Sequence, residues 1–276
     1  MFLRILLFCF IAITSRPRAA EPLQIILLEN HAPATAADRI NVESRILERL
    51  QQLAQPDLQI TVMQVGNLRA LELLKLSSNY CALNKLKTSE RLENWLFAEM
   101  PTSIYPPLQL ISTEYIQADA IDLAELLKTQ PRLKIGIVGG RHYGASLDQL
   151  IKQNAQRFYV RNGDDAAENL AMMLNLRRLD AIIEFTAIVE ASLLHSGRAM
   201  TLHAHPLKDQ PAIRGYLVCN KSPQGKLLIG KVNQLFASKA LREAIVQYHQ
   251  DFFSANDWQL LETEVRQTFQ VPSAIP

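Results

Sequence analysis

The sequence predicts an α/β protein in which mostly parallel sheets are flanked by helices. Three observations support this fold class. Short, continuously apolar runs, as expected of strands buried on both faces, alternate with stretches of helical periodicity. The alternation places helices on both faces of a parallel sheet. It is interrupted between Ser112 and Ala118 and then begins again, which predicts two lobes with a boundary there.

The first series contains four expected strands, at 23–28, 58–65, 80–83 and 108–112. A helix is expected over 39–54, where apolar residues recur every three or four positions. A second helix is expected over 67–76, with Asn67 as its capping residue. A third, short helix follows the strand at 80–83.

The second series begins with the apolar run 133–138 and continues with strands at 157–160, 180–185 and 200–204. The expected helices lie at 118–127, 145–154, 165–176 and 186–194. A last strand at 214–220 precedes a long helical stretch, 227–253, which we expect to break near Ser238. An amphipathic helix at 258–269 ends the series.

Composition excludes some classes of function. The chain has 276 residues, of which 48% are hydrophobic, and its formal net charge is +2. The lysines and arginines are scattered and form no basic stripe, so we expect no nucleic-acid partner. His203 and His205 alternate on one strand, but no third ligand is suggested, so we expect no metal and no cofactor.

The N-terminus has the pattern of a secretory signal peptide. Arg4 precedes an apolar run from Ile5 to Thr14, and small residues follow at Ala19 and Ala20. The run is shorter than the roughly 20 residues that a membrane span needs. We expect residues 1–20 to be removed on export to the periplasm, although a cleavage site nearer Thr14 is an alternative.

The turn after the strand at 80–83 has the features of an anion site. Thr88 can cap the helix that follows, and Arg91 lies in its first turn. A helix N-terminus favours negative charge, and the guanidinium group offers a planar fork of donors to a carboxylate. The alternative is an ordinary solvated helix start.

This segment resembles the first lobe of bacterial periplasmic solute-binding proteins of the amino-acid-binding type (family 3, type II fold). That family reads roughly T-x-E-R, then F-S-x-P-Y and a strand. Here Thr88-Ser89-Glu90-Arg91 matches, and Phe97-Ala98-Glu99-Met100-Pro101 follows in a degraded form. The chain resembles most a divergent branch of the family that has a cysteine just before this turn, as Cys81 is here. The resemblance covers most of the chain in element order, but only two or three short motifs are specific.

The resemblance implies two lobes joined by a hinge, with a cleft between them. Lobe 1 would comprise 21–113 plus 214–276, and lobe 2 would comprise 117–211, with hinge crossings near 113–117 and 211–216. It also implies that the strand at 214–220 returns beside the strand carrying Cys81, which would make Cys81 and Cys219 cross-strand neighbours able to form a disulfide. Two buried free thiols are the alternative.

Three turns would face such a cleft, because ligands bind at the carboxyl ends of the strands in open α/β sheets. The expected ligand-contacting residues are Asn84, Thr88 and Arg91 in the first turn, Arg141, His142 and Tyr143 in the second, and Glu184 and Phe185 in the third. Glu184 falls one residue from the family's amine-binding aspartate. The alternatives are a plain strand–helix turn at Gly140 and a solvated rim carboxylate at Glu184.

The resemblance implies an exported, monomeric binding protein that closes around a small polar or anionic, amino-acid-like solute. Its partner would be the permease of an ABC-type transporter. One alternative is an enzyme on the same fold, dehydratase-like or peptidoglycan-cleaving, in which Glu184 or Glu29 would act as the acid. The other is a sensory or orphan binding module that serves a signalling partner.

Overall fold

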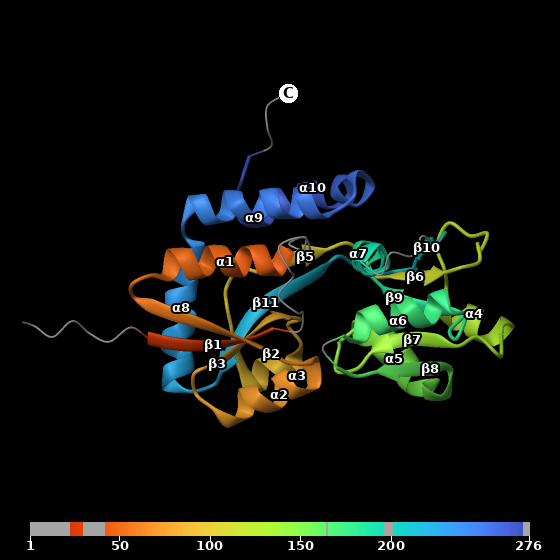
Figure 1. Cartoon of the computed structure of the whole chain (residues 1–276), viewed down its shortest axis with the longest axis horizontal. Helices are drawn as coiled ribbons and strands as arrows, with labels where there is room; N and C mark the ends of the chain where they lie inside the picture. The colour runs from red at the N-terminus through yellow and green to blue at the C-terminus, as the bar shows by residue number, and fades with distance from the viewer. Residues whose placement is uncertain (1–22, 30–41, 164, 196–200, 273–276) are drawn as a thin grey trace, which may run out of the picture.

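The computed structural model describes residues 23–29, 42–163, 165–195 and 201–272. The expected signal peptide lies outside this part of the chain. Two sheets, of six and five strands, form two lobes with helices packed around them (Figure 1). We call the six-stranded sheet with its helices lobe 1 and the five-stranded sheet with its helices lobe 2.

Lobe 1 has the strand order β2-β1-β3-β11-β4, with β5 also paired to β11. Its strands are β1 (Leu23–Glu29), β2 (Leu58–Gln64), β3 (Tyr80–Lys85), β4 (Trp95–Phe97), β5 (Ser103–Tyr105) and β11 (Ile213–Asn220). The strands that alternate with helices, β1, β2 and β3, pair in parallel as predicted. The return strand β11 pairs antiparallel with β3, β4 and β5.

Lobe 2 has the strand order β10-β6-β9-β7-β8. Its strands are β6 (Gln109–Ser112), β7 (Ile135–Val138), β8 (Phe158–Arg161), β9 (Ala181–Glu184) and β10 (His203–Pro206). Strands β7, β8 and β9 pair in parallel, whereas β6 pairs antiparallel with β9 and β10.

The position of β6 corrects the first lobe boundary. The sequence placed the strand at 108–112 at the end of lobe 1, but its backbone pairs with β9 and β10 of lobe 2. The chain therefore crosses between the lobes at 106–108, where Pro106 and Pro107 separate β5 from β6, and not at 113–117. The second crossing, 207–212, joins β10 to β11 and overlaps the expected range.

The helices pack around these sheets. They are α1 (Val42–Ala54), α2 (Asn67–Leu76), α3 (Ser89–Asn94), α4 (Leu123–Thr129), α5 (Ala145–Gln153), the 3-10 turn η1 (Ala155–Arg157), α6 (Ala166–Asn175), α7 (Thr186–His195), α8 (Pro223–Phe236), α9 (Lys239–Phe252) and α10 (Ala255–Phe269). The predicted break near Ser238 is confirmed, because α8 ends and α9 begins on either side of it. No helix in the described ranges is both long enough and apolar enough to cross a bilayer.

Several local expectations differ from the structure. The helix expected at 118–127 begins at Leu123, because Asp122 caps it by accepting the Glu125 N–H at 3.1 Å. Strands β4 and β5 were not predicted, since each is only three residues long and forms by pairing with β11. Gly66, not Asn67, is the N-cap residue of α2.

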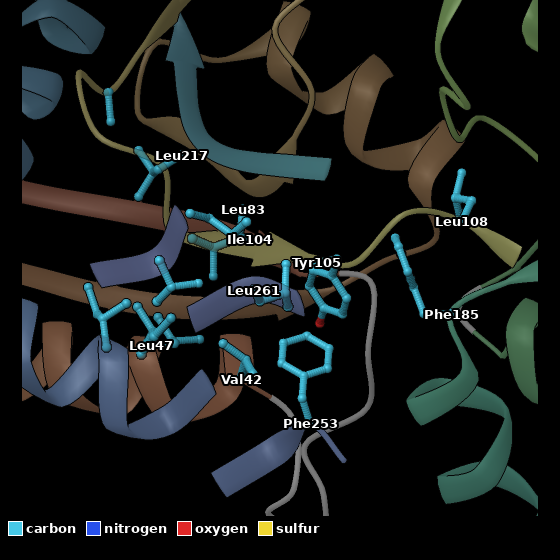
Figure 2. Close-up of a cluster of buried hydrophobic side chains, with 14 of the residues drawn as sticks. Val42, Leu47, Leu83, Ile104, Tyr105, Leu108, Phe185, Leu217, Phe253 and Leu261 are labelled. Carbon is cyan, nitrogen blue, oxygen red and sulfur yellow. The ribbon is translucent and has the colours of Figure 1, made fainter. Parts of the chain in front are cut away.

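A continuous core reaches from lobe 1 into lobe 2. Tyr105 on β5 packs its ring against Phe185, which follows β9, with ring centroids 4.5 Å apart. Figure 2 shows Tyr105 among the apolar side chains of lobe 1, with Phe185 and Leu108 reaching in from the direction of lobe 2. Buried His249 on α9 accepts the backbone N–H of Ile104 at 2.9 Å and so ties β5 to the outer helices.

Candidate functional site

A cavity of about 80 Å³ lies at the junction of the two lobes. Residues from both lobes line it: Glu43, Asn67, Leu83, Asn84, Lys85, Leu86, Arg91, Leu108, Gly140, Arg141, His142, Phe185, Ile213 and Gly215. The lobes also approach each other near its wall. A Cβ atom added to Gly140, whose φ is +71°, would lie 2.9 Å from Cδ2 of Leu68 on α2. Glycine therefore suits this position both for its backbone conformation and for the close approach.

Arg91 lines the cavity from lobe 1. Thr88 caps α3 as predicted, accepting the Arg91 N–H at 3.2 Å, and this fixes where the arginine leaves the helix. The Arg91 guanidinium donates to the carbonyl of Leu86 at 3.3 Å. Burial lowers the pKa of Arg91 from its usual value, while the nearby Glu90 raises it. Among the described residues, no carboxylate forms an ion pair with Arg91.

Lys85 ends β3 with its side chain buried at the cavity wall, only 5% exposed. Its Nζ donates to Oδ1 of Asn67 at 2.9 Å. Burial, together with the positive charges of Arg91 and Arg141, lowers the pKa of Lys85 to about 7, and Glu43 offsets only part of that shift. The two positive neighbours of Lys85 therefore outweigh its negative neighbour, Glu43.

Glu43, in the first turn of α1, is a buried carboxylate of lobe 1 that lines the cavity. Tyr105 donates its hydroxyl to Oε2 at 2.6 Å, and Asn84 donates its amide to Oε1 at 2.6 Å. Burial raises the pKa of Glu43, and the Tyr105 hydrogen bond opposes that shift. Asn84 has φ of +53°, a left-handed conformation that asparagine tolerates better than most residues, and this backbone turn accompanies the contact.

Arg141 and Glu184 form a buried ion pair within lobe 2. Nη1 of Arg141 lies 2.6 Å from both Oε1 and Oε2 of Glu184, whose side chain is 1% exposed. The backbone N–H of Phe185 adds a third hydrogen bond, at 2.9 Å to Oε1. Burial acts to lower the pKa of Arg141, but the Glu184 carboxylate raises it above its usual value.

The rest of the 140–146 turn contributes less to the cavity. His142 lines it and pairs through Nδ1 with Oδ2 of Asp148. Burial lowers the pKa of His142, and the charge of Arg91 acts in the same direction. Tyr143 instead points into the core of lobe 2, where its hydroxyl accepts the Val138 N–H at 2.7 Å.

Comparison with solved structures identifies the fold. A putative L-cystine ABC transporter protein from Listeria monocytogenes is 14% identical, with a TM-score of 0.61 over 85% of this chain and 97% of that one. An ancestral arginine-binding protein bound to glutamine is 13% identical, with a TM-score of 0.63 over 86% and 99%. A histidine kinase sensor domain with similarity to periplasmic binding proteins is 11% identical, with a TM-score of 0.60 over 84% and 95%. The chain has the type II periplasmic-binding-protein fold. No family model and no curated protein matches the sequence.

The periplasmic-binding-protein fold brings several predicted site residues together. Asn84, Arg91, Arg141, His142 and Phe185 line the cavity. Thr88, Tyr143 and Glu184 do not line it: Thr88 caps α3, Tyr143 is a core residue, and Glu184 lies behind Arg141. Glu184 is also not the solvated rim residue of the alternative interpretation, because its side chain is buried.

Sequence reasoning missed Glu43, Asn67 and Lys85 as cavity residues. Lys85 carried one signal, since it follows an apolar strand and precedes the turn that contains Arg91. Asn67 was interpreted only as a helix cap. Glu43 carried no signal, because its partners Asn84 and Tyr105 lie 41 and 62 residues away in sequence.

The predicted disulfide between Cys81 and Cys219 is present. The two residues are register partners on β3 and β11, and both are fully buried in lobe 1. The bond fastens the return strand of the periplasmic-binding-protein fold to the strand that carries Lys85. Among the described residues, no three His, Cys, Asp or Glu side chains gather in a group that could hold a metal ion. Backbone, but not side chain, is described for Glu29.

Proposed function

We propose that this protein is an exported solute-binding protein whose two lobes close around a small polar or anionic solute. The observation that carries the proposal is the cavity between the lobes, into which Arg91 brings a guanidinium group with no described carboxylate partner. A carboxylate or similar anion would accept its planar fork of donors. The two crossings at 106–108 and 207–212 would act as the hinge.

Closure would follow from the ligand's contacts with both lobes. Lys85 and Arg91 belong to lobe 1, and Arg141 and His142 belong to lobe 2. A ligand that touches both sets binds the closed form more tightly than the open form, and this difference in affinity shifts the population toward closure. Ring packing between Tyr105 and Phe185 would keep the lobes in contact near the hinge.

Transport is the biological role we propose, with the permease of an ABC-type importer as partner and the periplasm as location. The signal-like residues 1–20 and the similarity to a putative L-cystine ABC transporter protein support it. The similarity to a histidine kinase sensor domain supports sensing as the other use of the same closure. A permease–ATPase pair encoded by neighbouring genes can be reconstituted in liposomes with the ligand-bound protein. Stimulation of the ATPase by this protein would favour transport, and no stimulation would favour sensing.

A thermal shift screen tests the binding function. The mature chain is heated with amino acids, small peptides, dicarboxylates and cyclic polar solutes, each at millimolar concentration. A true ligand at about one hundred times its Kd adds about 2.7 kcal/mol to the free energy of unfolding. Failure of every solute class to raise the melting temperature would contradict the proposal.

A second candidate function, an enzyme on the same fold, is favoured by Glu43. This carboxylate lines the cavity, and burial raises its pKa, as a general acid requires. Incubation of the protein with each solute that binds, followed by mass spectrometry, would detect turnover. Conversion that is lost in Glu43→Gln while binding persists would favour the enzyme, and recovery of unchanged solute would favour the binding protein.

A further inference from the structure

Two buried carboxylates, Glu43 in the cavity wall and Glu184 behind Arg141, are both engaged by the protein itself. Glu184 receives two hydrogen bonds from Arg141 and one from the Phe185 backbone. Glu43 receives one from Tyr105 and one from Asn84. An ammonium group on a ligand would need such an acceptor, and displacing Arg141 from Glu184 would leave two buried charges to be paired again. The cavity therefore offers a poor environment for a ligand amine.

Cations, in contrast, are in excess around the cavity. Lys85, Arg91 and Arg141 all line it, and among the described residues only Arg141 has a carboxylate ion-pair partner. Lys85 and Arg91 instead bind neutral oxygens, those of Asn67 and Leu86. Burial and the two arginines depress the pKa of Lys85, and the buried carboxylate Glu43 offsets only part of that shift.

We infer that the solute is a small dianion without an ammonium group, of the dicarboxylate or inorganic oxyanion class, bound between Lys85 and Arg91. The inference rests on the proposed function and narrows its substrate class. Arg91 would take one anionic group in a fork geometry, and Lys85 would take the other as a point charge. Arg141 would supply positive potential from lobe 2. Because it occupies the Glu184 carboxylate, that carboxylate is not available to a ligand amine.

The test compares ligands that differ only in an amine. Isothermal titration measures binding of succinate against L-aspartate and of glutarate against L-glutamate, with inorganic phosphate as the oxyanion arm. We expect a dicarboxylate or phosphate to bind at least about tenfold more tightly than either amino acid. The reason is that the ammonium group of an amino acid would be buried without a hydrogen-bond acceptor, which is costly. Preferential binding of the amino acids would overturn the inference while leaving the proposed function intact. No binding by any of the five would overturn the inference, and the wider solute screen would then decide the proposed function separately.

Two variants test whether Lys85 contributes to binding of the dianion. Lys85→Met removes the buried ammonium group, and Lys128→Met removes an exposed one on α4 with the same change in net charge. We expect Lys85→Met to weaken binding of the preferred dianion by about 10- to 100-fold and Lys128→Met to leave it within about twofold. Circular dichroism confirms folding of both variants. Equal affinities in Lys85→Met and the wild-type protein would overturn the assignment of Lys85.

Discussion

Arg141 holds both carboxylate oxygens of Glu184 through a single nitrogen, Nη1, at 2.6 Å each. The carboxylate is buried and the arginine side chain is only 17% exposed, so water screens the pair weakly. Such a pair contributes less net stability than its geometry suggests, because burying both charges is unfavourable. Removing one partner is nevertheless strongly destabilising, since the other charge is left buried.

A double-mutant cycle on this pair gives the first prediction. Arg141→Met alone should lower the free energy of unfolding by about 3–5 kcal/mol, because the Glu184 carboxylate loses its cation. Arg141→Met combined with Glu184→Leu should recover most of that loss. Urea denaturation at pH 7 measures all four corners of the cycle. Additive losses would mean that the two residues do not act as a pair.

Lys85 predicts a dependence of stability on alkaline pH. Its pKa is lowered by burial, and further by Arg91 and Arg141, from 10.5 to about 7 in the folded chain. Between these two pH values the unfolded chain binds a proton that the folded chain lacks, so stability rises with pH, by up to about 1.4 kcal/mol per unit from this group. Below about pH 7 the full penalty is present.

The measurement is chemical denaturation from pH 6.5 to 9.5 on the wild-type protein, Lys85→Met and the control Lys128→Met. The rise in stability should persist in Lys128→Met and shrink in Lys85→Met, which should also be the more stable protein near pH 7. Parallel curves for all three proteins would show that Lys85 titrates normally.

The burial of His249 predicts a dependence of stability on acidic pH. Its Nε2 accepts the Ile104 N–H at 2.9 Å and its Nδ1 faces the Ile245 carbonyl at 2.7 Å, so the neutral ring fits the site and the protonated ring does not. Burial lowers the pKa of His249 to about 4. The unfolded chain therefore binds the extra proton between pH 6.5 and 4, and stability falls as pH falls through that window.

Proton NMR of the imidazole group follows this directly. The His249 resonance should stay at its neutral position down to about pH 4, well below the usual imidazole pKa of about 6.5. Titration of His249 near 6.5 would contradict its burial and its contact with β5.

The disulfide predicts a large stability difference on reduction. Cys81 and Cys219 are 138 residues apart, and closing so long a loop stabilises a fold by about 4–5 kcal/mol in the chain-entropy model. The double variant Cys81→Ala/Cys219→Ala should lose a similar amount in urea denaturation. Wild-type protein under dithiothreitol serves as the comparison without a side-chain change. A loss below about 1 kcal/mol in both would show that the bond is not formed in solution.

The sequence predicted those parts of the fold whose signals are local. The parallel cores of both lobes, the cap at Thr88 and the break near Ser238 each follow from short runs of residues. The partner of an apolar strand is not a local property, which is why β6 was placed in lobe 1. Strands β4 and β5 are too short to carry their own signal and depend on β11, more than 100 residues later.

The candidate site divides in the same way. Arg91 could be predicted because the turn, the cap and the arginine are adjacent in sequence. The pairing of Arg141 with Glu184 could not, because it joins the ends of two strands 43 residues apart. Arg141 and Glu184 were predicted as two separate ligand contacts. The three-dimensional structure shows that they form an ion pair with each other.

If the Arg91 guanidinium meets a ligand's negative charge between the two lobes, removing this group should abolish binding. Isothermal titration with the best ligand compares the wild-type protein, Arg91→Ala and the control Arg178→Ala, which removes an exposed arginine outside the cavity. We expect Arg91→Ala to melt near the wild-type temperature without ligand, because within the described residues the Arg91 side chain makes one hydrogen bond, to Leu86. We also expect the variant to show no measurable binding. Wild-type affinity in Arg91→Ala would show that this guanidinium group does not hold the ligand.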